Sequence, residues 1–194
     1  MNEAEKSTKK RKVAWGITGS GDKLQETVEI MSEIKKQYEN VVSIEVYLSK
    51  AGEQVVKYYK LDDCLKSNFG RVTVEVDSNS PFLAGWLETQ KYEFLLVAPA
   101  TSNTVAKISN GIADTLLSNA SIMALKALVP VYIMPCDYKE GLIHTKLPGG
   151  QDITLKVRKE DVANVRKLEA MENVSLIEKP QDIRRVFRKH FENV

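Results

Sequence analysis

The chain alternates between short apolar runs and longer stretches whose apolar positions recur with a helical period. The apolar runs predict strands at residues 13–18, 42–48, 72–76, 94–98 and 131–134. Apolar residues three or four positions apart predict helices between these strands, at residues 23–38, 50–59, 82–90 and 113–128. Strands and helices in alternation favour an α/β fold, a flavodoxin-like Rossmann arrangement with a doubly wound parallel sheet in three layers.

The order of strands in this sheet predicts where a ligand binds. The simplest topology puts the second and third strands on one side of the first strand, and the fourth and fifth on the other side. The switch point then lies between the first and fourth strands. Ligands of open α/β sheets bind at such a point, beyond the carboxyl ends of the strands.

After residue 135 the pattern changes. A turn at 147–152 follows, flanked by extended pieces such as 153–157. A helix capped by Asp161 and running to 171, a short strand at 173–177 and a final helix starting at Pro180 complete the prediction. We expect residues 1–12 to be a disordered basic tail and residues 13–194 to form one domain.

Composition narrows the function classes. Hydrophobic residues at 43% and charged residues at 28% are typical of a soluble globular protein, and a net charge of +2 does not argue for nucleic acid. The chain has no long apolar run and no signal-peptide core, so we expect a cytoplasmic protein without a membrane segment. Basic residues on the last helix, Arg184, Arg185, Arg188 and Lys189, form a solvated face or a docking surface for an acidic partner.

The two cysteines and two histidines do not form a recognisable site. Cys64 and Cys136 are far apart in sequence and lack the spacing of a zinc or iron–sulfur site, so no metal is expected. Cys136 follows the fifth strand. Filling a small apolar space is a simpler role for it than providing a thiol beside a ligand. His144 is interpreted as a surface or packed histidine rather than a proton relay.

Small polar residues follow the fourth strand in a segment that we call the second loop, residues 99–104. Pro99 cannot donate to a strand ladder and ends the strand. Thr101, Ser102, Asn103 and Thr104 then offer hydroxyls, an amide and backbone N–H groups where a helix begins. This segment is therefore a candidate polar cradle for a ligand.

The first loop, residues 16–22, allows three interpretations. A P-loop is excluded because Asp22 stands where the lysine should follow the second glycine. A dinucleotide fingerprint needs different glycine spacing and an acidic residue after the second strand, where Ser49 and Lys50 stand instead. The third interpretation is a site in which Thr18, Ser20 and Ser49 bind the phosphate of a mononucleotide beside a helix N-terminus. A tight turn without a ligand remains an alternative.

The sequences Gly16-Ile17-Thr18-Gly19-Ser20, Ala98 to Ile108 and Asn110 to Leu117 together resemble FMN-binding flavoproteins of the homo-oligomeric flavin-containing cysteine decarboxylase superfamily. Within it, the start Trp15 to Asp22 and the segment 156–168 are similar to the archaeoflavoprotein A and dihydromethanopterin reductase branch. The resemblance implies bound FMN, a homo-oligomer built from trimers, a ferredoxin-like electron donor and a pterin as acceptor.

The resemblance also implies roles for individual residues. Gly19, Ser20 and Ser49 would contact the phosphate, and Asn103 would face the substrate. Asp114 would order the loop and helix around it. Four residues of the second loop would lie along the ribityl chain and ring after Pro99, namely Ala100, Thr101, Ser102 and Thr104.

Two departures from the decarboxylases favour simple flavin redox chemistry. The segment 80–90 lacks their catalytic histidine, and residues 135–140 lack their clamp sequence. We therefore expect an FMN-dependent oxidoreductase in which the cofactor carries the chemistry and no side chain is required as an acid or base. A flavin-dependent decarboxylase or prenyltransferase, and a noncatalytic electron carrier, remain the alternatives.

Overall fold

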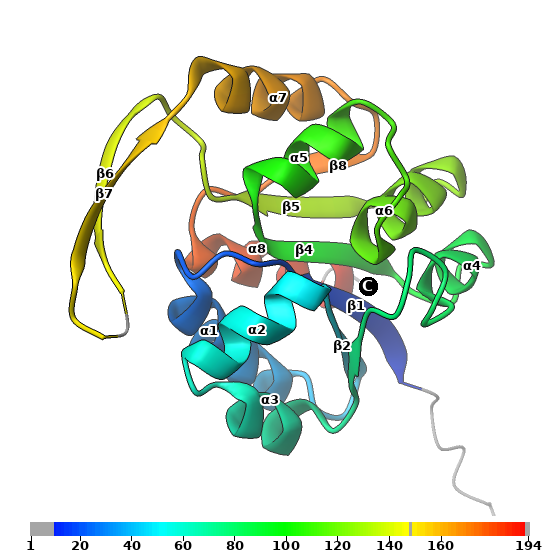
Figure 1. Ribbon diagram of the computed structural model, residues 1–194. Helices are drawn as coiled ribbons and strands as arrows, with labels where there is room; N and C mark the ends of the chain where they lie inside the picture. The colour runs from blue at the N-terminus through cyan, green and yellow to red at the C-terminus, as the bar shows by residue number, and fades with distance from the viewer. Residues whose placement is uncertain (1–9, 148, 193–194) are drawn as a thin grey trace, which may run out of the picture.

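A computed structural model describes residues 10–147 and 149–192 and confirms the predicted α/β fold (Figure 1). Six parallel strands form one sheet in the order β3-β2-β1-β4-β5-β8. The chain winds outward from β1 in both directions, so the switch point lies between β1 and β4, as predicted. The strands are β1 Arg11–Ile17, β2 Val42–Leu48, β3 Val72–Val74, β4 Phe94–Ala100, β5 Val131–Pro135 and β8 Val174–Leu176.

Helices cover both faces of the sheet and make the three layers. One layer contains α1 Leu24–Gln37, α2 Lys50–Tyr58, α3 Asp62–Phe69 and α8 Ile183–Phe191, the last preceded by a 3-10 turn at Pro180–Asp182. The other contains α4 Leu83–Glu88, α5 Ser102–Ser109, α6 Leu116–Lys126 and α7 Lys159–Glu169. None of the helices in the described part of the chain is long and apolar enough to cross a bilayer.

The two central strands are buried on both faces, which explains their unbroken apolar runs. In β1, Trp15 packs in the core on one face while Ala14 packs on the other. In β4, Leu96 packs on the same face as Trp15, and Leu95 packs on the same face as Ala14. Both loops at the switch point therefore start from strands that are paired with each other and buried on both faces.

The start of the sheet differs from the prediction. β1 begins at Arg11, so the last two residues of the expected tail belong to the sheet, and residues 1–9 lie outside the described residues. Arg11 forms an ion pair with Glu93, with Nη2 and Oε2 2.6 Å apart. Lys12 bonds Glu45 in β2, at 2.7 Å between Nζ and Oε1. These two ion pairs stabilise strand structure at residues 11 and 12, which the composition of the tail predicts to be disordered.

Two other elements also depart from the prediction. The N-cap of helix α7 is Arg158, three residues before the expected cap at Asp161, and Asp161 completes a capping box from the first turn. The Asp161 carboxylate accepts a hydrogen bond from the Arg158 backbone N–H, and the Arg158 guanidinium lowers the pKa of that carboxyl. The helix α3 was not predicted. The strands β6 Gly141–Lys146 and β7 Asp152–Val157 pair antiparallel as a hairpin that stands beside the sheet (Figure 1).

Candidate functional site

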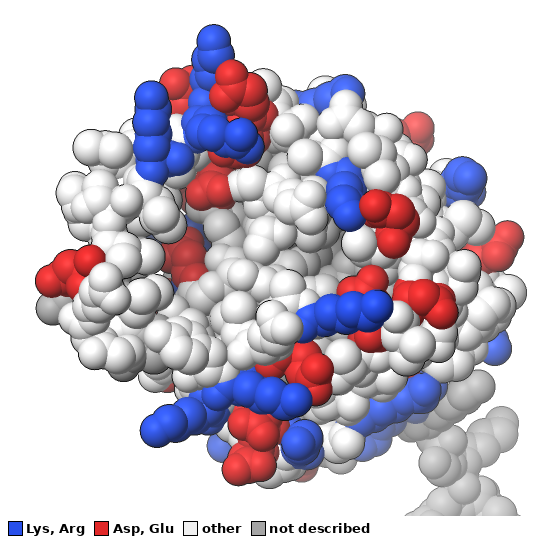
Figure 2. Space-filling view, in the orientation of Figure 1, with Lys and Arg blue, Asp and Glu red and all other residues white. Residues whose placement is uncertain are grey.

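The carboxyl ends of β1, β2 and β4 border a cavity of about 630 Å³, which we call the central cavity. The starts of α2, α5 and α6 form its walls, and in Figure 2 the surface is hollowed between these helices with uncharged atoms over most of its floor. Its lining residues are Thr18, Gly19, Ser49, Lys50, Ala51, Glu75, Asp77, Ser78, Thr101, Asn103, Thr104, Asp114, Thr115 and Leu117.

A hydroxyl residue caps each of the three helices at the cavity. Ser49 Oγ accepts from Gly52 N at 2.9 Å, at the start of α2. Thr101 and Thr115 accept in the same way from the first turns of α5 and α6. Helix N-termini present unpaired N–H groups and a positive dipole end, so three of them around one cavity favour an anionic ligand. Because Ser49 Oγ accepts the capping bond, its own O–H can still donate to such a ligand.

Thr18 braces the first loop against the second loop. Its hydroxyl donates to Pro99 O and accepts from Thr101 N, both at 2.8 Å. A further bond runs from Trp15 Nε1 to Ala98 O at 2.8 Å inside the core. Thr18 is 1% exposed, so its hydroxyl serves the contact between the loops. A contact between Thr18 and a phosphate would have to replace one of these bonds.

Two glycines allow α2 to approach the first loop closely. A Cβ added to Gly52 would lie 2.4 Å from the Ile17 carbonyl oxygen, and one added to Gly19 would lie 2.6 Å from Ala51 Cβ. Both distances are shorter than any side chain tolerates. The N-terminus of α2 therefore reaches the end of β1 because these two positions have no side chain.

A second cavity of about 280 Å³, the hairpin pocket, adjoins the central cavity and shares Gly19 and Thr101 with it. Its roof comes from the hairpin and is apolar, formed by Ile143, Leu147, Ile153 and Leu155. Its floor is polar and is formed by Ser20, Gly21, Asp22, Tyr59, Ser102, Cys136 and Asp137. Acidic side chains show in the recess between the hairpin and the body of the molecule in Figure 2.

Burial and neighbouring charges raise the pKa values of two residues in the floor of the hairpin pocket. Burial, with the charge of Asp137 nearby, raises the pKa of Asp22. Burial also raises the pKa of the Cys136 thiol to about 12, and the thiol donates to Ser20 Oγ at 2.9 Å. Ser102 Oγ donates to Asp137. Cys136 is therefore a protonated hydrogen-bond donor near neutral pH and does not present a thiolate.

The structure divides the predicted site residues between the two cavities. Thr18, Gly19, Ser49, Thr101, Asn103 and Thr104 line the central cavity. Ser20 and Ser102 line the hairpin pocket. Pro99 and Ala100 stand behind the cavities in β4, where Ala100 is fully buried. The sequence predicted that these residues lie at one end of the sheet, but it did not predict that they line two cavities.

Sequence reasoning missed three acidic residues, Glu75 and Asp77 after β3 and Asp137 after β5. Glu75 and Asp77 line the central cavity, and Asp137 lines the hairpin pocket. The signal was present, because β3 also ends at the ligand-binding edge of the sheet and polar residues follow it directly. His144 lies on the hairpin bonded to Thr154, and His190 packs beside Phe94; neither histidine lines the central cavity or the hairpin pocket.

With this fold and this site, the chain belongs to the Flavoprotein family, whose pattern matches residues 1–182. The family predicted from the two loops is therefore confirmed. Among its relatives is an uncharacterized protein of Methanocaldococcus jannaschii, 52% identical over 181 residues that cover 93% of this chain and 96% of that protein.

Two further relatives have descriptions that bear on function. A dihydromethanopterin reductase (acceptor) of Methanocaldococcus jannaschii is 31% identical, covering 91% of this chain and 95% of that protein. The DmrB protein of Burkholderia xenovorans was solved in complex with FMN as a cubic protein cage for redox transfer. Its structure matches with a TM-score of 0.79 and 29% identity, over 95% of this chain and 97% of DmrB.

Proposed function

We propose that this protein binds FMN in the central cavity and is an FMN-dependent oxidoreductase, passing electrons from a ferredoxin-like donor to a pterin acceptor. The observation that carries this proposal is the convergence of three hydroxyl-capped helix N-termini on a cavity at the switch point of the sheet. Such a cavity suits a ligand with a phosphate and a polyhydroxyl chain, and its size suits a mononucleotide. Similarity to DmrB and to a dihydromethanopterin reductase supports the same choice.

The chain's own residues would bind and orient the cofactor. When bound, FMN supplies hydride or single-electron transfer. Ser49 and the backbone N–H groups of the first loop would hold the phosphate, while Thr101, Thr104 and Asn103 would bind along the rest of the molecule. Thr18 and the glycines would act indirectly, because they fix the loops and helix that carry these donors.

We propose that the acceptor enters the hairpin pocket. The pocket adjoins the central cavity, and its apolar roof can cover one face of a flat ring. The floor offers the carboxylates of Asp22 and Asp137, which accept hydrogen bonds from the N–H groups of a pterin-type ring. A bidentate carboxylate contact of this kind would orient the ring against the cofactor.

The donor surface proposed for the last helix is partly neutralised within the chain. Arg184 pairs with Glu33, and Arg185 lies 3.5 Å from Asp182. An acidic donor would still gain from the positive charge that remains, mainly in its association rate. Charge reversal at Arg188 and Lys189 should then slow reduction by the donor and weaken its salt dependence. An unchanged rate and salt dependence would rule this surface out.

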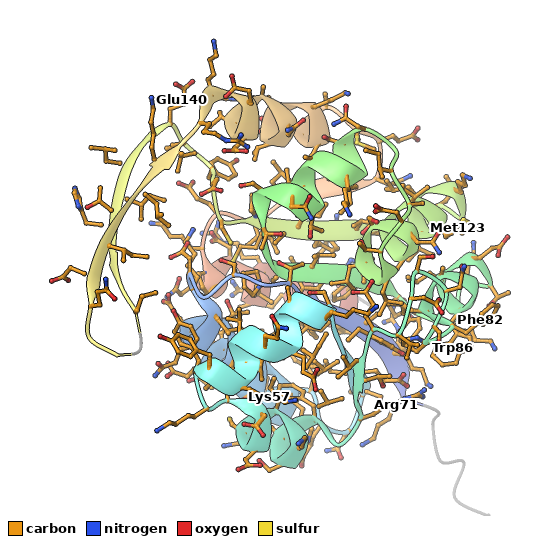
Figure 3. The ribbon with its side chains drawn as sticks, viewed as in Figure 1. Lys57, Arg71, Phe82, Trp86, Met123 and Glu140 are labelled. Atoms are coloured by element: carbon orange, nitrogen blue, oxygen red, sulfur yellow. The ribbon has the colours of Figure 1, made fainter. Side chains whose placement is uncertain are left out.

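We also propose that the chain assembles with copies of itself, in oligomers built from trimers. Aromatic side chains gather on the end of the molecule away from the hairpin, where Figure 3 labels Phe82, Trp86 and Arg71. Phe82 is 61% exposed and packs edge-on against Trp86, and the Arg71 guanidinium lies 5.1 Å from the Trp86 ring. An exposed aromatic cluster of this kind is typical of interfaces. Phe82→Asp should lower the mass measured by light scattering.

The first experiment is a visible spectrum of the purified protein, taken before and after anaerobic reduction with dithionite and again after adding a dihydropterin. A yellow two-band spectrum that bleaches and then returns with the pterin is the expected result. A yellow colour that returns only when redox proteins are added would favour the noncatalytic electron carrier. Protein that is colourless and takes up no added FMN would overturn the proposed function. Turnover of a cysteine-ended peptide, or prenylation of FMN, would favour the decarboxylase or prenyltransferase alternative.

A further inference from the structure

The carboxylate of Glu75 joins the starts of two helices that belong to different layers of the fold. Its Oε2 accepts from the backbone N–H of Lys50 at 3.1 Å, and its Oε1 accepts from that of Leu116 at 2.8 Å. Lys50 and Leu116 are the first residues of α2 and α6. Because α2 and α6 pack on opposite faces of the sheet, one side chain links both helical layers.

The position of Glu75 in the fold explains how it reaches both helices. It directly follows β3, the strand at the edge of the sheet, and its own N–H donates to Leu48 O at 2.9 Å. The segment after β3 rises between α2 and α6 in Figure 1. At this edge no further strand of the described sheet separates the layers, so the carboxylate can contact both of them.

The chain that follows Glu75 is held in place as well. Asn119 in α6 donates from Nδ2 to Ser78 O at 2.9 Å, and Val76 N donates to Ser80 O at 2.8 Å. The loop after β3 is therefore attached to α6 at a second point. This attachment keeps the Glu75 carboxylate between the two helices.

Glu75 also lines the central cavity, next to the two residues that cap the same helices. Ser49 caps α2 and Thr115 caps α6, and all three side chains face the cavity. A carboxylate at a helix N-terminus gains from the dipole and from charge-assisted hydrogen bonds, here at two helices at once. One charged side chain thus joins the two helix starts beside the cavity.

We propose that Glu75 is a positioning residue for the flavin. It holds the N-termini of α2 and α6 at the spacing in which the cavity receives the cofactor, and it keeps a negative charge beside the cavity that disfavours electron uptake by the cofactor. The inference rests on the proposed function, and it adds a residue that neither loop at the switch point contains.

The test compares Glu75→Gln and Glu75→Ala with the wild type, and with Glu53→Gln as a control on the solvent-facing side of α2, where Glu53 pairs with Lys57. Glutamine keeps the size of the side chain but has one acceptor oxygen and no charge. We expect Glu75→Gln to bind FMN about tenfold more weakly and to raise the midpoint potential of the bound flavin. Glu75→Ala should bind more weakly still, and Glu53→Gln should match the wild type.

Amide hydrogen exchange of the protein without FMN gives an independent readout. In Glu75→Gln we expect faster exchange at residues 50–52 and 116–118, with exchange in β1 and β4 unchanged. A general loss of stability would instead speed exchange throughout the sheet. Should Glu75→Ala fail to fold, Glu75→Asp takes its place. Aspartate keeps the charge but is too short to bridge both helices, so its potential should stay near the wild-type value while its FMN affinity falls.

The outcomes separate this inference from the proposed function. Wild-type protein that takes up no FMN would overturn the proposed function and this inference with it. Wild-type protein that binds FMN, with Glu75→Gln unchanged in affinity, potential and local exchange, would overturn the role of Glu75 alone.

Discussion

The central cavity and the hairpin pocket share two residues but are built from different parts of the chain. The walls of the central cavity are helix starts carried by the sheet, with each start capped by a hydroxyl residue. The hairpin pocket has a floor made from the loops of the sheet and a roof made from a hairpin outside it. The first region is thus fixed by the fold, and the second by a local addition to it.

The two regions also differ in the hydrogen-bonding groups that they offer. The central cavity is lined by carboxylates as well, those of Glu75, Asp77 and Asp114, but it also presents N–H and O–H donors from its three helix starts, which suit an anionic ligand. The floor of the hairpin pocket presents the carboxylates of Asp22 and Asp137 as acceptors. This contrast suggests a division in which the sheet selects the cofactor and the hairpin selects the molecule that reacts with it.

The largest expected effect concerns Cys136 in the floor of the hairpin pocket. With its pKa raised to about 12, the thiol is deprotonated in about one molecule in ten thousand at pH 8, so alkylation by iodoacetamide should be about a thousandfold slower than for a free cysteine. Mass spectrometry of peptides after timed labelling measures the rate. The protein unfolded in guanidinium is the control, and equal rates in both states would contradict the raised pKa of this thiol.

The next effect tests the apolar roof with two leucines on opposite faces of the hairpin. Leu155 lines the hairpin pocket and Leu142 does not, although both are more than half exposed. Leu155→Asp should lower kcat/KM for the pterin by about thirtyfold, because it removes apolar cover and adds a charge beside an acidic floor. Leu142→Asp should change it little, and FMN affinity should stay the same in both. Equal losses in the two variants would mean that the hairpin acts through its folding alone.

A smaller effect is expected in the central cavity. Ser49→Ala removes the cap of α2 and a hydroxyl donor together, so FMN should bind about tenfold more weakly while the KM for the acceptor stays unchanged. Titration of the apoprotein followed by flavin fluorescence measures the affinity. Ser67→Ala, in the exposed last turn of α3, is the matched control. A change in acceptor KM without a change in FMN affinity would reverse the division between the two regions.

The smallest effect is the pH dependence that Asp22 contributes to stability. Since burial raises its folded pKa, the folded protein holds this proton more tightly than the unfolded chain does. Asp22 therefore opposes folding above its folded pKa, and this opposition disappears below the ordinary range of aspartate. Asp22→Asn should gain stability over the wild type at pH 7, and the gain should vanish at pH 3 in urea unfolding. The gain is small because the side chain is 40% exposed.

The sequence predicts the sheet well because both faces of its central strands are buried. Unbroken apolar runs such as Phe94 to Val97 have few alternatives to a covered strand, and the polar residues after them mark the ligand edge. The helix α3 was missed because its apolar positions are few; of its eight residues only Leu65 and Phe69 are buried. Its Asp62 and Asp63 start was the available signal.

The candidate site was predicted in part, for a physical reason. Ser49 and Thr101 can be found because hydroxyl residues after a strand and before a helix are N-caps at the ligand edge. Thr18 looked equivalent, but its use inside the protein depends on the distance to Pro99, which no spacing in the sequence encodes. Glu75 and the hairpin roof depend on contacts between layers, and such contacts exist only once the fold has formed.

The bonds of Thr18 use no atom from outside the chain, so the two loops that it joins keep their arrangement on their own. On the proposed function, these two loops of a newly made chain would already be arranged before its flavin binds. The amount of working protein in a cell would then follow the supply of riboflavin phosphate, and chains made during a shortage would remain ready for later use.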